Sequence, residues 1–281
     1  MRPNIIKAGL LGLPLSSSLS PEIFHIFSGL AGIEIRYELR ECGAAELAAV
    51  IETVQAGGWA GFNVTIPYKQ TVFKMLNLAD PASRGIRAVN SVRFGKKGLE
   101  GWNTDAAGIM SSLEENGISP AGKNVVIFGS GGAAGAAGWA MGRSRAASVT
   151  FRARNGGAAL QTAGNLAEVF PETIYKAEPF AASAGTAEIF INATPLGMYS
   201  PGMPAATPKP GDVCLDLAYT RNGTEFIKTA AAAGASVIDG LEVLVRQAVL
   251  SLRSWTGLPA GDIVEFNREA LKLLRNKLER G

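Results

Sequence analysis

Short apolar runs bounded by glycine, proline or asparagine alternate along this chain with longer segments whose apolar residues recur at helical spacing. The short runs predict strands, which in the first third of the chain cover 5–11, 35–39, 61–64 and 88–94. The longer segments predict helices at about 21–31, 44–56 and 68–77. Because such alternation is typical of sheets covered by helices, we predict an α/β fold.

The length of 281 residues exceeds that of a usual single domain. A helical stretch over 106–115 ends at a typical stop, Asn116-Gly117. A second series of predicted strands follows at 124–128, 148–152, 188–192, 213–217 and 236–238. Two further helical segments, 241–252 and 263–278, are expected to return to the first domain. We therefore predict one domain from 1–104 plus about 241–281 and a second, doubly wound domain from 105–240.

Charge and cysteine usage argue against several classes of protein. The 27 basic and 24 acidic residues are scattered, without the basic stripe that would follow a phosphate backbone, so we expect no nucleic-acid partner. Cys42 and Cys214 lie far apart and outside any metal-binding spacing, which predicts no metal site and a reduced, cytoplasmic setting. The single histidine, His25, is expected to be a partly buried helix residue.

The apolar run 5–15 faintly imitates a signal peptide. Lys7, Gly9, Gly12 and Pro14 interrupt this run, so we expect a buried strand instead. No stretch of about 18 uninterrupted apolar residues occurs, and we expect no membrane span. The expected partner is a small-molecule substrate, bound by a monomer or a homodimer.

The segment 124–133 is an apolar strand that runs into a glycine turn and then into a helix of small residues. Glycines allow the backbone to turn tightly and to approach a pyrophosphate, whose charge is stabilised by the free N–H groups of the helix start. A plain strand-to-helix turn shows the same pattern, so the turn alone leaves both alternatives open. The expected dinucleotide contacts are Gly129, Ser130, Gly131, Gly132 and Ala133.

The next predicted strand ends at Arg152, Ala153 and Arg154, followed by Asn155. An NAD-binding fold usually places an acidic residue there to accept hydrogen bonds from ribose hydroxyls. A carboxylate would repel a 2′-phosphate, whereas a guanidinium binds one through paired, charge-assisted hydrogen bonds. We therefore predict NADP as the cofactor, with Arg152, Arg154 and Asn155 on its adenosine side. The alternative for either arginine is an exposed charge at a strand end.

Four motifs of the first domain resemble those of the shikimate dehydrogenase family. Ser18-Leu19-Ser20-Pro21 resembles the family's Ser-x-Ser-Pro loop, and residues 63–69 resemble its Asn-Val-Thr-x-Pro-x-Lys signature. Ala88-Val89-Asn90-Ser91 is similar to Ala-Val-Asn-Thr, and Asn103-Thr104-Asp105 to the stretch whose aspartate acts beside the lysine.

Three motifs farther along complete the family order over residues 14–247. They are Ile191-Asn192-Ala193-Thr194, Asp216-Leu217-Ala218-Tyr219, and Asp239-Gly240-Leu241 followed by Gln247. The chain departs from the family where Asn-Arg-Thr becomes Ala153-Arg154-Asn155, where serine replaces threonine at Ser91, and where leucine replaces a frequent methionine at Leu217. These departures bear on cofactor affinity more than on the class of reaction.

The resemblance implies an NADP-dependent oxidoreductase that interconverts shikimate and 3-dehydroshikimate in chorismate and aromatic amino acid biosynthesis. It also implies an N-terminal α/β substrate domain and a Rossmann-like NADP domain. Lys69 and Asp105 are the implied catalytic pair. The substrate contacts that we expect are Ser18 and Ser20 at the carboxylate, with Thr65, Asn90, Asp105, Tyr219 and Gln247; the further cofactor contacts are Thr194, Leu217 and Gly240.

Oxidation of a secondary alcohol removes a hydride and a proton. Nicotinamide accepts the hydride, and without a cysteine cluster, a histidine pair or a metal site the proton acceptor is a lysine, a tyrosine or a carboxylate. Our hypothesis is that Lys69 is the acid/base and that Asp105 positions it. Taken singly, Lys69 is better explained as a surface charge and Asp105 as a helix cap, and Ser20 is also an ordinary helix cap.

Two alternatives remain open. A quinate or dual quinate/shikimate dehydrogenase would use the same fold and the same chemistry. A non-catalytic NADP-binding regulator on this scaffold would be expected to lack the pair formed by Lys69 and Asp105, and both residues are present. Fold alone does not separate these functions.

Overall fold

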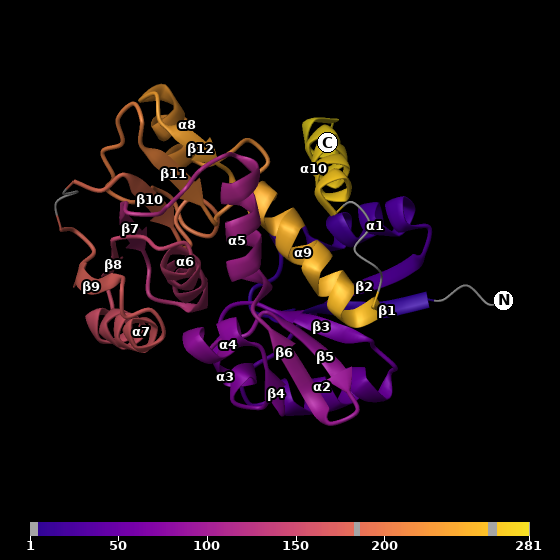
Figure 1. Ribbon diagram of the computed structural model, residues 1–281. Coiled ribbons are helices and arrows are strands. Elements are labelled where there is room, and N and C mark those ends of the chain that lie inside the picture. Colours follow the sequence, from indigo (N-terminus) through magenta and orange to yellow (C-terminus); the bar gives the residue numbers. More distant parts are fainter. Residues whose placement is uncertain (1–4, 183–185, 258–262, 281) are drawn as a thin grey trace. The chain divides into compact units, whose positions relative to one another are not determined.

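The computed structural model describes residues 5–182, 186–257 and 263–280, which form two compact units (Figure 1). Unit 1 comprises Met1–Thr104 together with Val245–Gly281, and unit 2 comprises Asp105–Leu244. Each unit contains one six-stranded sheet with helices, which confirms the predicted α/β class.

Unit 1 is built on a sheet of strand order β2-β1-β3-β5-β6-β4. Strands β1, β2 and β3 are parallel, whereas β5 runs antiparallel to both β3 and β6. The strands are β1 (Ile5–Gly12), β2 (Glu34–Glu41), β3 (Gly61–Val64), β4 (Leu78–Ala79), β5 (Ser91–Gly95) and β6 (Gly98–Trp102). The helices are α1 (Ser20–Ala31), α2 (Leu47–Ala56), α3 (Lys69–Phe73), α4 (Pro81–Ile86) and α10 (Ile263–Arg280).

Two helices have residues in both units. Helix α5 (Thr104–Glu115) starts at the last residue of the first segment of unit 1, and α9 (Gly240–Thr256) belongs to unit 1 from Val245 onward. The last helix, α10, packs on α1, and the rings of Phe27 and Phe266 lie 5.3 Å apart. The C-terminal helix therefore returns to the unit formed by the N-terminal residues, as predicted.

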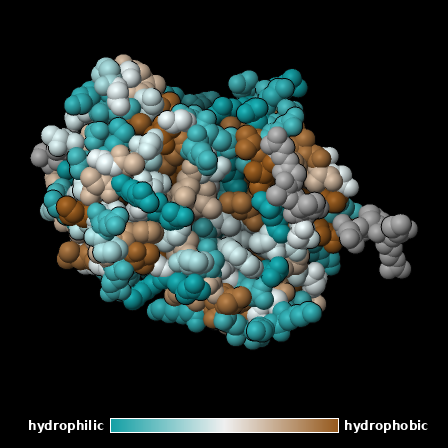
Figure 2. All heavy atoms as spheres, in the orientation of Figure 1, coloured by the Kyte–Doolittle hydropathy of each residue, from teal (hydrophilic) through white to brown (hydrophobic). Residues whose placement is uncertain are grey.

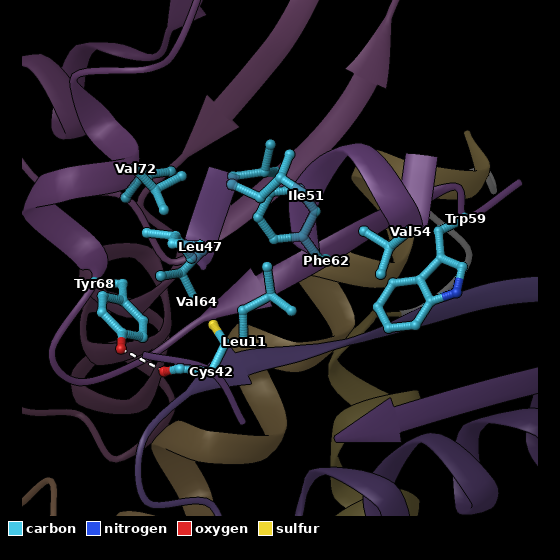
Figure 3. Close-up of a cluster of buried hydrophobic side chains, with 12 residues drawn as sticks. Leu11, Cys42, Leu47, Ile51, Val54, Trp59, Phe62, Val64, Tyr68 and Val72 are labelled. Carbon is cyan, nitrogen blue, oxygen red and sulfur yellow. Dashed lines mark hydrogen bonds between the residues drawn. The ribbon is translucent and has the colours of Figure 1, made fainter. Parts of the chain in front are cut away.

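A hydrophobic cluster of unit 1 joins α2 and α3 to the sheet (Figure 3). Phe62 on β3 and Val72 on α3 are completely buried, and Leu47 and Ile51 of α2 pack against them. Burying a side chain of this size stabilises a fold by about 1.5–3 kcal/mol. The Tyr68 hydroxyl donates a hydrogen bond to the carbonyl oxygen of Cys42 at 2.5 Å. This cluster fixes the backbone that leads from β3 into α3.

Several boundaries in unit 1 differ from the prediction because of pairing between distant residues. The helix expected at 68–77 ends at Phe73, since residues 77–79 join β6: Asn77 donates its N–H to the Leu99 carbonyl at 2.8 Å. The strand expected from 88 begins at Ser91. His25 is exposed on α1, so the expected partial burial is wrong; the buried residues of that helix are Ser20, Ile23, Phe24 and Phe27.

Unit 2 is an all-parallel sheet of order β12-β11-β10-β7-β8-β9. This order is that of the doubly wound dinucleotide-binding fold, whose ligands bind at the carboxyl ends of the strands. The strands are β7 (Asn124–Phe128), β8 (Ser148–Ala153), β9 (Ile174–Pro179), β10 (Ile189–Asn192), β11 (Val213–Asp216) and β12 (Ser236–Ile238). The helices within unit 2 are α6 (Gly132–Arg143), α7 (Gly156–Val169) and α8 (Glu225–Ala232).

Surface and side-chain composition add three observations. Figure 2 shows hydrophilic residues interspersed with small hydrophobic groups on the face in view. Among the described residues, no helix combines the length and apolar character needed to cross a membrane. In that same part of the chain, no group of three or more histidine, cysteine, aspartate or glutamate residues could hold a metal ion.

Candidate active site

One edge of the sheet in unit 1 gathers the residues of four predicted motifs. Strands β1 and β3 are parallel neighbours, so the loops that follow them start at the same edge. Strand β5 starts at Ser91, opposite Asn63 near the end of β3, and β6 ends at Trp102, opposite Ser91. Asn90, which precedes β5, and Thr104, which follows β6, therefore lie at that edge as well.

The loops after β1 and β3 are bonded to each other through the backbone. Leu13 donates its N–H to the Ile66 carbonyl at 2.9 Å, and Thr65 donates to the Leu11 carbonyl at 3.0 Å. Ser20 is buried and is the first residue of α1, and its N–H donates to the Ser18 hydroxyl at 3.3 Å. The cap position of α1 is Leu19, which makes no side-chain cap, so Ser20 is not the helix cap.

Lys69 and Asp105 occupy the first turns of two helices. Lys69 is half-buried at the start of α3, and its carbonyl accepts a hydrogen bond from the Val89 N–H at 3.1 Å. Asp105 is half-buried in the first turn of α5, where a negative charge is favoured by the helix dipole. Since α5 begins at Thr104, Asp105 lies inside the helix rather than at its cap.

A buried polar network joins Asn90 to Thr104 and Gln247 within unit 1. The side-chain oxygen of Asn90 accepts the Thr104 N–H at 2.7 Å. Its side-chain amide donates to the Thr104 hydroxyl at 2.9 Å and to the side-chain oxygen Oε1 of Gln247 at 3.3 Å. The Thr104 hydroxyl donates to the same Gln247 oxygen at 3.3 Å. Because an unpaired buried polar group costs about 1–3 kcal/mol, these mutual bonds hold the three side chains in one arrangement.

Three residues outside the predicted site support this network. The Asn63 amide donates to the Asn90 carbonyl at 3.0 Å and to the Ser251 hydroxyl at 2.8 Å, and it accepts from the Tyr37 hydroxyl at 2.9 Å. Ser251 lies four residues after Gln247 on α9, which places both on one helix face. The spacing of four residues from Gln247 could have indicated Ser251 from the sequence. Asn63 could have been found from its place in the motif that contains Lys69.

The glycine turn of unit 2 has the geometry that a close backbone approach requires. Gly129 has φ +123°, and a Cβ atom there would lie 2.8 Å from the carbonyl oxygen of Ala193, so only glycine fits. Its N–H donates to the Arg152 carbonyl at 2.8 Å. Gly131 is the cap residue of α6, makes no side-chain cap, and has open space where a Cβ would stand. The start of α6 is therefore suited to an anion.

The two arginines at the end of β8 have different environments. Arg152 is buried, and its Nε donates to Glu178 of β9 at 3.2 Å. Arg154 is exposed. The Asn155 side chain caps α7 by accepting the Ala158 N–H at 3.0 Å. The alternative interpretation, an exposed charge at a strand end, therefore remains open for Arg154 but does not fit Arg152.

The ends of β10 and β11 are joined by the buried carboxylate of Asp216. It accepts hydrogen bonds from the Asn192 amide at 2.8 Å, the Ala218 N–H at 2.9 Å and the Thr224 hydroxyl at 2.5 Å. The pKa of this carboxyl is raised to about 6, chiefly by burial and to a smaller extent by the charge of Asp239, against the lowering effect of the three donors. The predicted cofactor residues Thr194, Leu217 and Gly240 follow the carboxyl ends of β10, β11 and β12.

Comparison with known proteins places these motifs in one family. A family model described as the shikimate dehydrogenase substrate binding domain matches residues 10–92. The shikimate dehydrogenase (NADP(+)) of Aeropyrum pernix is 36% identical over 276 residues, which cover 96% of this chain and 98% of that protein. A relative at this identity and coverage establishes the family and confirms the predicted enzyme class and cofactor.

Solved structures agree with this assignment. A shikimate dehydrogenase in complex with NADP+ has a TM-score of 0.82 at 30% identity, covering 95% of this chain and 94% of that one. The 5-ketofructose reductase of Gluconobacter sp. strain CHM43 has a TM-score of 0.83 at 30% identity, covering 96% and 98%. The quinate dehydrogenase of Corynebacterium glutamicum in complex with NAD has a TM-score of 0.83 at 26% identity, covering 95% and 99%. This chain belongs to the shikimate dehydrogenase family.

Proposed function

We propose that this chain interconverts shikimate and 3-dehydroshikimate with NADP, and that Lys69 is the acid/base at the reacting oxygen. The observation that carries the proposal is the buried network of Asn90, Thr104 and Gln247 at the edge of the sheet from which the loops of Ser18 and Lys69 also start. A group of fixed donors and acceptors at this edge suits a polyhydroxylated acid. Unit 1, 1–104 with 245–281, is then the substrate domain, and unit 2, 105–244, the NADP domain.

Each proposed substrate contact in unit 1 binds a particular group of the substrate. Ser18 and Ser20 bind the substrate carboxylate at the start of α1, where the helix dipole favours an anion. Thr65, Asn90 and Gln247 bind the ring hydroxyls. A substrate without those hydroxyls would leave buried polar groups unpaired, which is a strong basis for rejecting it.

Proton transfer falls to Lys69, which takes the proton of the substrate hydroxyl as the alcohol is oxidised. Asp105 positions the lysine ammonium and the same hydroxyl. The residue before it, Thr104, donates its N–H to Asn90 within unit 1. Tyr219, two residues after Leu217, completes the proposed substrate contacts.

The residues of unit 2 fit NADP, which accepts the hydride when bound. Gly129, Ser130, Gly131, Gly132 and Ala133 line the turn into α6, whose capping glycine leaves space for a pyrophosphate. Among the adenosine-side residues, exposed Arg154 would bind the 2′-phosphate, while Arg152, held by Glu178, and Asn155, the cap of α7, would shape the strand end around it. Thr194, Leu217 and Gly240 would contact the nicotinamide half.

The function is tested by following NADPH formation with shikimate and quinate side by side, and NADPH consumption with 5-ketofructose. We expect the highest kcat/KM with shikimate. A higher value with quinate would transfer the assignment to the quinate alternative, and binding of NADPH without turnover of any of the three would favour the non-catalytic regulator. We further propose that this protein is a cytoplasmic enzyme of chorismate and aromatic amino acid biosynthesis and that it acts as a monomer or a homodimer.

Cofactor preference gives a second test. We expect Arg154→Ala to lower kcat/KM with NADP by at least about tenfold and to leave kcat/KM with NAD nearly unchanged, because a hydrogen bond to a charged group contributes about 1.5–3 kcal/mol. Arg143→Ala is the matched control, since Arg143 is an exposed arginine at the C-terminal end of α6, and the glycine turn leads into the other end of that helix. A wild type that prefers NAD, with a preference insensitive to Arg154→Ala, would show that NADP is the wrong cofactor.

A further inference from the structure

Asp216 is a completely buried carboxylate that receives hydrogen bonds from three separate segments of unit 2. The Asn192 amide comes from the end of β10, the Ala218 N–H from the loop after β11, and the Thr224 hydroxyl from the cap of α8. Three donors on one carboxylate form a charge-assisted cluster, stronger than bonds between neutral groups. The cluster links the carboxyl ends of two neighbouring parallel strands.

The same cluster fixes the loop that follows β10. The Asn192 side chain donates to the Leu196 carbonyl at 3.2 Å and accepts from the Thr194 N–H at 3.0 Å and the Thr194 hydroxyl at 2.6 Å. Since one Asn192 side chain bonds both Asp216 and Thr194, the orientation of the Thr194 loop depends on the carboxylate.

The loop after β11 is held equally closely. The Leu217 N–H donates to the Asn192 carbonyl at 2.8 Å, and Ala218 donates to the carboxylate itself. At Gly240 a Cβ atom would lie 2.4 Å from the Ala218 carbonyl oxygen, so the start of α9 packs directly against this loop. The backbone at Thr194, Leu217 and Gly240 thus converges on one buried group.

We propose that Asp216 is a positioning residue that orients the Thr194 and Leu217 loops to receive the nicotinamide half of the cofactor. This inference rests on the proposed function, because those loops are the nicotinamide-side contacts assigned there. An asparagine is not equivalent to the carboxylate. One carboxylate oxygen accepts from Asn192 and Ala218, but the other, which accepts from the Thr224 hydroxyl, would become an amide NH2 that can only donate, and the charge that strengthens all three bonds would be lost. A misplacement of about 1 Å at a reacting centre is enough to cost about a hundredfold in rate.

The decisive experiment compares NADPH with 2′,5′-ADP, which carries the adenosine half of NADP without nicotinamide. We expect Asp216→Asn to raise the Kd for NADPH, measured by its fluorescence, by at least about tenfold, with the Kd for 2′,5′-ADP unchanged. In steady state, KM for NADP rises and kcat falls. KM for shikimate changes less than KM for NADP, because most of its proposed contacts, among them Ser18, Asn90 and Gln247, lie in unit 1.

Asp212→Asn is the matched control, since Asp212 is a buried aspartate at the opposite end of β11, where it accepts the Lys209 N–H at 3.0 Å. We expect it to leave both dissociation constants unchanged. If Asp216→Asn does not fold, Thr224→Val removes one donor at nearly constant shape and must give the same split between the two ligands.

Equal weakening of NADPH and 2′,5′-ADP would overturn the inference, because it would show a general loss of structure in unit 2. So would an unchanged NADPH affinity. Failure of the proposed function is separate and appears in the wild type: no NADPH binding rejects both proposals, whereas normal NADPH binding without shikimate turnover rejects the proposed function alone.

Discussion

Replacing Lys69 by alanine is expected to lower kcat for shikimate oxidation by at least about a hundredfold, the usual contribution of a general acid–base group. The KM for shikimate should change little, since the carboxylate and hydroxyl contacts proposed for Ser18, Ser20, Asn90 and Gln247 are retained. Lys69 is the first residue of α3 and follows Tyr68, a member of the buried cluster in Figure 3, and its carbonyl accepts the Val89 N–H. The alanine variant keeps that backbone bond, so the loss should be chemical rather than structural.

Lys74→Ala is the control for this prediction. Lys74 is an exposed lysine at the other end of the same short helix, and its replacement should leave kcat unchanged. Circular dichroism and urea unfolding would establish that both variants fold. Turnover by Lys69→Ala within about tenfold of the wild type would remove lysine from the proton step and return the role to a tyrosine or a carboxylate.

Sequence patterns located those elements whose signals are local. The apolar run 61–64 and the run 124–128 were predicted to the residue because each is a short, buried strand bounded by a clear change of composition. Strands β4, β6 and β9 were not predicted. Strand β4 has two residues and is defined by the pairing of Leu78 with Glu100 and of Ala79 with Gly101. The partly exposed β9 is defined by its pairing with β8. Pairing of this kind is tertiary and leaves little trace in the local sequence.

The candidate site shows the same difference between residues with a local sequence signal and residues defined by distant contacts. The residues proposed to touch ligands were found through motifs. Asn63 and Asp216 lie in those motifs but were given no role, and Ser251 lies outside them, because all three act through partners far away in the chain. A signal existed for Asp216, because a polar residue that ends a fully apolar strand, here Val213–Asp216, must find hydrogen-bond partners. The difference between Arg152 and Arg154 had no such signal, since Glu178 lies on the strand that was not predicted.

The second prediction concerns stability and follows from the pKa of Asp216, which burial raises from 3.8 to about 6. Between these two values the folded protein binds more protons at this site than the unfolded chain does. Stability contributed by this group is therefore present at low pH and is lost as the pH rises through about 6. The full loss is roughly 3 kcal/mol, of which about 2 kcal/mol falls between about pH 4.5 and pH 7.5.

The measurement is the difference in unfolding free energy between the wild type and Asp216→Asn, from urea unfolding at several pH values. Trp139 is the one tryptophan of unit 2 and reports on its unfolding, while the other three lie in unit 1. As the pH rises, the unfolding free energy of the wild type should fall relative to that of Asp216→Asn. Asp212→Asn retains Asp216 and should follow the wild type; a pH-independent difference between wild type and Asp216→Asn would contradict the raised pKa.

The groups facing Asp216 favour this interpretation of the pH dependence. Asp239 raises the pKa of Asp216 by its charge. Burial, with the charges of Asp212 and Asp216, raises the pKa of the Cys214 thiol to about 12, so the thiol stays neutral throughout the range. At neutral pH the ionised carboxylate therefore lowers the stability of unit 2, although its three donors offset part of the burial cost. A buried charge that reduces stability under working conditions is expected where it has a functional task, and holding the Thr194 and Leu217 loops is such a task.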